Sequence, residues 1–263
     1  MSNIQLQGAS ASTGNQRKWF DGDYVYKEDL LGYEGLVETL ASRLAAQTNL
    51  TRFGVTMYEP VFYKGKLCCK SRNFNPDKVE ELSLHKFLLS YYGTDLNGVY
   101  TIYLNTCDTL LETMFDFVRE TVFTAYGYDI KEWLALTLKF DWLILNEDRH
   151  FRNLVFLKTS DGYRPSPLFD NGAGLLADTT MDYPMSGDVY LLMKESKAKT
   201  ICDSFDEQLD ISETLYGENI KFNFTQKDVR ELLENVTEYT QVEKNRVERI
   251  VCAQMNKYGY LFK

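Results

Sequence analysis

The sequence predicts an α+β protein of two unequal lobes, a small β-rich lobe at the N-terminus and a larger, mostly helical lobe at the C-terminus. Its 263 residues fit one large domain or two lobes that share an interface. Two hairpin patterns flank a helical pattern before residue 72, whereas helical periodicity dominates the remainder. We therefore expect an N-terminal lobe over residues 1–75 and a C-terminal lobe over residues 76–263.

Each element of the small lobe follows from a local pattern. The β-prone residues 18–20 and 24–27 surround an Asp-Gly turn, which is typical of a hairpin. In residues 34–47, leucines recur four positions apart and predict a helix with one apolar stripe. Residues 54–70 predict a second hairpin, which turns at a Lys-Gly pair.

The large lobe begins after a turn-rich break at residues 73–78. Two long apolar patterns predict helices over residues 108–126 and 130–145, and we expect the second helix to be deeply buried. Apolar residues 154–157 and residues 163–169 lie on either side of a turn, so they predict a short strand hairpin.

The composition excludes several classes of function. The 29 basic and 38 acidic residues give a net charge of −9, which argues against direct nucleic-acid binding and against docking on an acidic membrane. No apolar run is long enough to span a bilayer. Five cysteines without a CxxC pair, and only two histidines, argue against zinc and favour free thiols in the cytoplasm, although secretion as an effector stays open.

The residues with the clearest chemistry lie between positions 146 and 170. A buried helix leads into a polar loop that holds Asp148, His150 and Asn153, and the strand hairpin that follows ends at Asp170. Because a hairpin returns near its start, we expect Asp170 to lie beside Asn153. Carboxylate and amide oxygens of this kind suit Mg²⁺. The five-residue interval from Asp148 to Asn153 is that of a kinase catalytic loop.

A family resemblance rests on these motifs. The pattern Asn-x-Asp-Arg-His-x-x-Asn at residues 146–153, followed by Tyr-Arg-x-x-Pro-Leu-Phe-Asp at residues 163–170, resembles the C-terminal kinase core of HipA-like serine/threonine protein kinases and of the compact CtkA-type kinases. The Asp-Arg-His-x-x-Asn part is also shared with phosphoinositide 3-kinases. The resemblance implies a two-lobed protein-kinase-like fold, with ATP and Mg²⁺ as cofactors.

The resemblance also assigns roles to individual residues. Catalysis is expected from Asp148, Asn153 and Asp170, and the last two of these would hold the metal. ATP would be bound by a phosphate-facing loop in the front segment, by a strand lysine, by a helix glutamate that pairs with this lysine, and by the catalytic-loop histidine. The corresponding residues are Gly14, Gln16, Lys18, Lys27, Glu38 and His150.

Three further expectations concern the site. Glu34 lies one turn before Glu38 and is its rival for the ion pair with Lys27. We expect Arg149 to neutralise negative charge in the site, and His150 to fix the loop by a hydrogen bond.

The front loop is also a candidate for regulation. It carries Ser10, Ser12 and Thr13, and HipA-like kinases can autophosphorylate a serine at this place, which would repel ATP. Full-length HipA kinases carry an extra N-terminal subdomain before this loop, whereas this sequence starts almost at the loop. We therefore expect that a separate small regulatory or antitoxin protein could be a partner.

The predicted function is ATP- and Mg²⁺-dependent transfer of the γ-phosphoryl group to a Ser or Thr hydroxyl of a protein substrate. One alternative is a lipid or small-molecule kinase related to phosphoinositide kinases. The segment after Asp170 lacks Lys and Arg, which disfavours a phosphoinositide headgroup. An ATP-binding pseudokinase regulator is a second alternative, and an interaction protein without a nucleotide site is a third.

Overall fold

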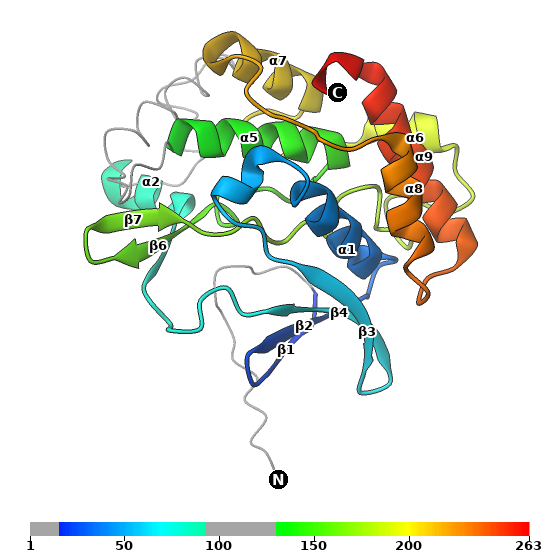
Figure 1. The fold of residues 1–263 in the computed structure, drawn as a ribbon, viewed down its shortest axis with the longest axis horizontal. Coiled ribbons are helices and arrows are strands. Elements are labelled where there is room, and N and C mark those ends of the chain that lie inside the picture. The colour runs from blue at the N-terminus through cyan, green and yellow to red at the C-terminus, as the bar shows by residue number, and fades with distance from the viewer. Residues whose placement is uncertain (1–15, 93–129, 263) are drawn as a thin grey trace.

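The computed structural model describes residues 16–92 and 130–262 (Figure 1). The predicted helix over residues 108–126 lies outside the described residues. A mixed α+β architecture confirms the predicted fold class: a curved antiparallel sheet lies at one end, and most helices gather at the other (Figure 1).

Both predicted hairpins contribute to the four-stranded sheet. Its strands are β1 (Lys18–Asp21), β2 (Tyr24–Glu28), β3 (Tyr58–Tyr63) and β4 (Lys66–Arg72), in the spatial order β1-β2-β4-β3. The second hairpin turns at Lys64 and Gly65, which both have positive φ angles, 52° and 75°. A two-residue turn between antiparallel strands needs this conformation, and glycine adopts it without steric cost.

Helix α1 (Glu34–Ala45) packs against β3 and β4 on the inner side of the sheet. It ends two residues before the predicted boundary at residue 47. Eleven of its twelve residues are buried, because the C-terminal helix α8 (Gln226–Glu234) covers the side that faces away from the sheet. The helix thus presents polar as well as apolar side chains to the protein interior.

The larger part of the fold surrounds helix α5 (Ile130–Ile144), which packs against α7 (Phe205–Tyr216) and α9 (Gln241–Lys257) (Figure 1). As predicted, α5 is deeply buried, and 13 of its 15 residues are inaccessible to solvent. The remaining described helical segments are η1 (Asn49–Arg52), α2 (Leu84–Tyr92), α6 (Val189–Glu195) and η3 (Gly259–Leu261).

A second sheet connects the parts that carry the site. It has the order β5-β6-β7, formed by β5 (Glu81–Ser83), β6 (Val155–Thr159) and β7 (Gly162–Pro165). The predicted extension of the last strand to residue 169 is wrong: the strand ends at Pro165. Proline has no N–H to donate to a ladder, and the chain then crosses to Val55, where Leu168 forms an isolated parallel bridge.

One hydrophobic cluster runs from α1 through α5 to α9, so the sheet side and the helical side share a core. The lobe boundary at residues 75 and 76 stays a prediction. No helix in the described ranges combines the length and the apolar character that a bilayer crossing requires.

Candidate active site

The loop after α5 places Asp148 at the edge of a cleft. Leu145 adopts a positive φ of 49° and turns the chain out of the helix. Asn146 is buried, and its amide group donates to Asp141 Oδ1 (3.1 Å) while its oxygen accepts from Asp148 N (3.2 Å). The buried Asn146 therefore fixes the backbone of Asp148, whereas the side chain of Asp148 stays 40% exposed and lines the cleft.

Asp170 lies at the end of the crossing segment and faces two lysines. Its Oδ1 atom is 2.6 Å from Lys27 Nζ, and its Oδ2 atom is 3.9 Å from Lys18 Nζ. Burial alone would raise the pKa of this carboxyl group, but the two ammonium groups outweigh burial and hold its pKa well below the usual range. Asp170 is therefore an anion over the physiological pH range.

Lys27 of β2 contacts both helix α1 and Asp170. Besides Asp170, its ammonium group contacts Glu38 Oε1 of α1, and it lies 4.9 Å from the centre of the Tyr58 ring. Burial would lower the pKa of Lys27, but the carboxylates of Asp170 and Glu38 raise it well above its ordinary value. Lys27 therefore stays charged although it is buried.

The two candidate glutamates of α1 have different tasks. Glu38 is completely buried and forms the expected ion pair with Lys27. The rival Glu34 instead accepts hydrogen bonds from the backbone N–H groups before the helix, which are those of Leu30, Leu31 and Gly32. Glu34 thus satisfies donors at the start of α1.

Asn153 has a free oxygen that fits a metal ion. Its Nδ2 atom donates to the carbonyl oxygen of Asp148 (2.9 Å), which leaves Oδ1 pointing elsewhere. This Oδ1 atom is buried and has no hydrogen-bond partner among residues 16–92 and 130–262, and the residue is only 3% exposed. A buried acceptor without a donor is costly unless a ligand completes it. Together with the carboxylate of Asp170, it offers the hard oxygen ligands that suit Mg²⁺.

The cleft has a volume of about 500 Å³, within the range of small-molecule sites. Charged and polar side chains from both sides of the fold line it, among them Gln16, Lys18, Asp148, His150, Asp170 and Lys199. Burial lowers the pKa of Lys18, although the nearby Asp170 partly opposes this effect. The imidazole of His150 places Nε2 3.9 Å from Asp148 Oδ1, and its buried Nδ1 has no partner among the described residues. The prediction that His150 fixes the loop by a hydrogen bond is therefore wrong for this part of the chain, because neither ring nitrogen lies within bonding distance of a loop acceptor.

The predicted nucleotide site is described only in part. Gly14 of the phosphate-facing loop and the candidate phosphorylation sites Ser10, Ser12 and Thr13 lie outside the described residues. Of the predicted loop, the structure describes Gln16 and Lys18, and both line the cleft.

Arg149 occupies a different place from the one that its position in the motif suggested. It was expected in the site, yet its side chain is buried beneath the loop and bonded to Asp141 of α5 (Nε to Oδ2, 2.9 Å). It still helps to lower the pKa of Asp170 through its charge, but from behind the cleft. Asp141 itself was the signal in the sequence, because a carboxylate within the apolar stretch of a buried helix needs an internal partner.

Comparison with known proteins gives structural matches alone. No protein-family model matches the sequence, and no curated protein matches it either. The fold is similar to that of the proinflammatory kinase CtkA of Helicobacter pylori, with a TM-score of 0.68 and 17% identity over 97% of this chain and 93% of CtkA. It is also similar to HipA of Shewanella oneidensis MR-1, whose structure is a complex with HipB and operator DNA. For HipA the TM-score is 0.52 and the identity 14%, over 99% of this chain and 66% of that chain. This chain thus has the fold of the HipA and CtkA kinases, as its sequence motifs predicted.

Proposed function

We propose that the chain is an ATP- and Mg²⁺-dependent protein kinase that transfers the γ-phosphoryl group to Ser or Thr hydroxyls. The observation that carries this proposal is the position of Lys27 between Glu38 and Asp170, in a fold that places Asp148 at the same cleft. In kinases, a strand lysine paired with a helix glutamate binds phosphate oxygens, and the metal-loop aspartate lies opposite.

The two lysines would hold the triphosphate. Lys27 and Lys18 converge on Asp170 from β2 and β1, so both ammonium groups lie beside a carboxylate that lines the cleft. Phosphate oxygens entering there would share these charges with Asp170. Because both ammonium groups are in place before the substrate arrives, little reorganisation accompanies the reaction.

Asn153 and Asp170 would hold Mg²⁺, for which their oxygens are suited. When bound, the ion would neutralise charge on the β- and γ-phosphate oxygens. The chain's own contribution is to keep Asp170 ionised and to leave the Asn153 oxygen without a donor from the part of the chain that the structure describes.

Asp148 would orient the acceptor hydroxyl and accept its proton. In this step the acceptor oxygen bonds to the γ-phosphorus, the bond from phosphorus to the bridging oxygen breaks, and ADP leaves. Asn146 and Asn153 hold the backbone of Asp148 at its N–H and its carbonyl group, so the carboxylate projects from a fixed loop. His150 lines the same cleft and stands beside this carboxylate.

A protein kinase, a lipid or small-molecule kinase and a pseudokinase predict different products. A lipid or small-molecule kinase would need a recognition surface for its acceptor, and residues 171–188 after Asp170 contain no Lys or Arg that would attract an anionic headgroup. A pseudokinase would bind ATP without turnover. One experiment therefore separates the three functions.

The test uses the purified full chain with γ-labelled ATP, Mg²⁺ and a mixed protein substrate, followed by identification of the phosphorylated residue. We expect phosphoserine or phosphothreonine, which disappears when EDTA removes the metal. Asp148→Asn should lower the rate by about 10³-fold, in the range of general-base effects. The matched control is Asp161→Asn, at the exposed turn of the β6–β7 hairpin, which should leave the rate unchanged.

Three outcomes would each contradict a part of the proposal. Full activity of Asp148→Asn would show that another group takes the proton. Thermal stabilisation by ATP and Mg²⁺ without turnover would favour the pseudokinase. Labelled lipid without labelled protein would favour the lipid kinase.

Two further parts of the proposal concern regulation and partners. Autophosphorylation at Ser10, Ser12 or Thr13 would add negative charge to the ATP-binding end, and intact-mass measurement before and after incubation with ATP would detect it. The HipA structure contains HipB. By analogy we propose a small regulatory or antitoxin protein as a partner, which affinity purification of the tagged chain from its native host would test.

A further inference from the structure

A buried arginine ties the two loops of the site to the central helix. Arg149 is 1% exposed, and its guanidinium donates in three directions. Nε bonds to Asp141 Oδ2 of α5 at 2.9 Å, Nη1 to the carbonyl oxygen of Phe169 at 2.6 Å, and Nη2 to Asn171 Oδ1 at 2.6 Å. The residues on either side of Asp170 are therefore held by the residue that follows Asp148.

Asn171 passes this connection on to α1. Its backbone N–H donates to Glu38 Oε2 (2.9 Å), and Glu38 uses its other oxygen for Lys27. Asn171 and Glu38 are both completely buried. A continuous chain of polar contacts thus runs from Asp141 through Arg149, Asn171 and Glu38 to Lys27.

These polar groups can all keep their hydrogen-bond partners in one arrangement of α1, the loop that holds Arg149 and the segment around Asp170. If α1 rotated, Glu38 would lose its contacts with Lys27 and with the backbone N–H of Asn171. Neither of these two donors could bind water instead, because both are buried. If the segment that flanks Asp170 moved, Arg149 would lose two of its acceptors, Phe169 O and Asn171 Oδ1, in a buried place. Buried polar groups resist such changes because an unmade hydrogen bond costs far more inside a protein than in water.

The segment after Asp170 is likewise fixed by hydrogen bonds to other parts of the protein. The hydroxyl of Tyr33 donates to the carbonyl oxygen of Leu175 (2.8 Å), Thr179 N donates to Leu31 O (3.0 Å), and Arg246 Nη2 donates to Tyr183 O (3.0 Å). The Arg149 guanidinium does not face an external anion, because the protein buries it and supplies its acceptors.

We propose that Arg149 and Asn171 are positioning residues that hold α1 and both loops in the arrangement needed for phosphotransfer, so that the site requires no phosphate on residues 171–188. This inference rests on the proposed kinase function. Neither residue faces the substrate. Each acts through another group, Arg149 through Asn171 and Asn171 through Glu38.

The first test is a double-mutant cycle with Asn171→Leu and Arg149→Lys. Asn171→Leu removes the acceptor and keeps the same number and branching of side-chain heavy atoms, and Arg149→Lys keeps the charge but cannot bridge three acceptors. We expect each to lower kcat by about 10- to 100-fold, because small displacements of catalytic groups cost this much. The KM for ATP should change less. The double variant should lose little more than either single variant, because both changes break the same connection.

Thr137→Val is the matched control, since it also removes a buried hydrogen bond, from the hydroxyl of Thr137 to Trp133 O of α5. It should leave kcat unchanged. A second measurement is independent of activity: hydrogen exchange of the peptides that contain Glu38 and Asn171 should accelerate in both single variants and not in the control.

The outcomes separate this inference from the function on which it rests. If the wild-type chain shows no phosphotransfer, the proposed function fails, while the exchange measurement still reports on the connection. If the wild type is active and folded Asn171→Leu retains kcat within twofold, the positioning role is wrong. Losses that multiply in the double variant would show that the two residues act separately, which also contradicts it.

The second test addresses the phosphate. The purified wild-type chain is treated with a phosphatase, and mass spectrometry verifies that Thr179, Thr180 and Ser186 are unmodified. We expect its initial rate to stay at or above half that of the untreated chain. A rate that collapses, and that returns when one of these three residues is phosphorylated again, would overturn the independence from phosphate.

Discussion

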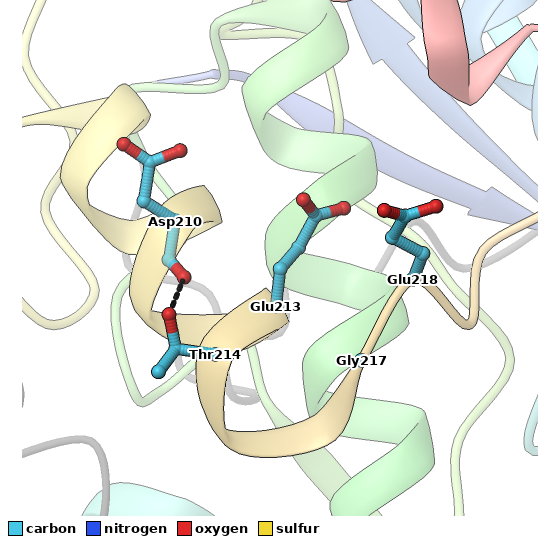
Figure 2. Close-up of a pocket in the computed structure, with 5 residues that line it drawn as sticks. All are labelled: Asp210, Glu213, Thr214, Gly217 and Glu218. Carbon is cyan, nitrogen blue, oxygen red and sulfur yellow. Dashed lines mark hydrogen bonds between the residues drawn. The ribbon is translucent and has the colours of Figure 1, made fainter.

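Two acidic cavities of the molecule, called the two hollows below, differ in how the neighbouring lysines contact their carboxylates. The cleft of the candidate active site contains Asp148 and Asp170. A second depression of about 570 Å³, at the end of α7, is lined by Asp210, Glu213, Thr214, Gly217 and Glu218. Figure 2 shows that Asp210 points away from the other two carboxylates, while the hydroxyl of Thr214 is bonded to the backbone of Asp210.

In the cleft, Lys18 and Asp170 both line the cavity, and the buried Lys27 contacts the same carboxylate from inside the protein. Beneath the depression, Lys139 is completely buried, and it donates to the carbonyl oxygen of Gly217 (2.5 Å) and to Asn219 Oδ1 (2.8 Å). Its Nζ atom also lies 3.7 Å from Glu213 Oε1. Lys139 therefore stabilises the fold through internal contacts, and the carboxylates that line the depression keep it acidic.

Carboxylates alone therefore do not define a site. Across residues 16–92 and 130–262, no three His, Cys, Asp or Glu side chains are grouped so that they could hold a metal ion, in the depression or elsewhere. The cleft differs because Lys18 and Lys199 line it, and because Asn153, which is bonded to the backbone of Asp148, has a buried oxygen without a hydrogen-bond partner in the described ranges. Substitutions in each place should separate the two hollows, with the largest effect expected in the cleft.

Replacing Lys27, which contacts Asp170 of the cleft, should have the largest effect. Lys27→Met removes the ammonium group that faces the phosphates and leaves Glu38 and Asp170 without their shared cation. We expect phosphotransfer to fall by about 10³-fold, which corresponds to ~4 kcal/mol in the barrier. Single-turnover kinetics with γ-labelled ATP would measure it.

The control for this variant is Lys66→Met on the neighbouring strand β4, where a half-exposed lysine pairs with Glu28 (3.1 Å). Glu28 also pairs with Arg17 (3.3 Å), so its carboxylate keeps a cation in this variant and the rate should not change. Lys27→Met with more than a tenth of the wild-type rate would remove the main distinction between the two hollows.

Replacing the lysine beneath the depression should lower stability and leave the chemistry intact. Lys139→Met removes the donor to two part-buried oxygens, so we expect the free energy of unfolding to drop by ~1–2 kcal/mol. Urea unfolding would measure the loss, while kcat should stay at the wild-type value. Glu218→Gln, an exposed change in the same depression, should alter stability by less than about 0.5 kcal/mol. A stable Lys139→Met that had lost phosphotransfer would instead give the depression a role in function.

Asp29 is a third kind of acidic position, held by hydrogen bonds without a lysine. Its Oδ1 accepts from Gly35 N at the start of α1 (2.8 Å), and its Oδ2 accepts from the hydroxyl of Tyr239 (2.7 Å). Burial raises the pKa of Asp29 from 3.8 to about 7, although the bond from Tyr239 works in the opposite direction. The absence of a cation thus gives a shift opposite to that of Asp170.

The sign of the resulting pH dependence follows from proton uptake. Between pH 3.8 and about 7, the folded chain keeps the proton on Asp29 while the unfolded chain releases it. The contribution of Asp29 to stability is therefore fully present below pH 3.8, falls as the pH rises, and is lost above about 7. The loss is on the order of 1–3 kcal/mol.

Asp29→Asn should remove this dependence. The stability of the variant minus that of the wild type should therefore become more positive as the pH rises from 5 to about 7, and level off above it. Denaturant unfolding at several pH values would measure this difference. A difference that stayed constant over the range would show that Asp29 is ionised throughout.

Local patterns in the sequence determined much of the framework. The Asp-Gly and Lys-Gly turns predicted both hairpins of the sheet, and the leucine spacing predicted α1 to within two residues of its end. The apolar run from residue 130 predicted α5 and its burial. The spacing of Asp148, Asn153 and Asp170 led to the family whose fold the structure shares. These features depend on residues that are close together in the sequence, so the sequence alone is enough to predict them.

The tertiary structure alone decided which charges meet. Glu34 and Glu38 lie one turn apart on the same helix, and only the angle at which α1 crosses the sheet directs Glu38 to Lys27 and Glu34 to the backbone. Likewise, Arg149 turns inward because Asp141 is buried below it. Lys27 and Asp170 are separated by 143 residues. Partners so distant are set by how whole elements pack, because a charge interacts with whatever the fold brings within a few ångströms, and no local pattern specifies that.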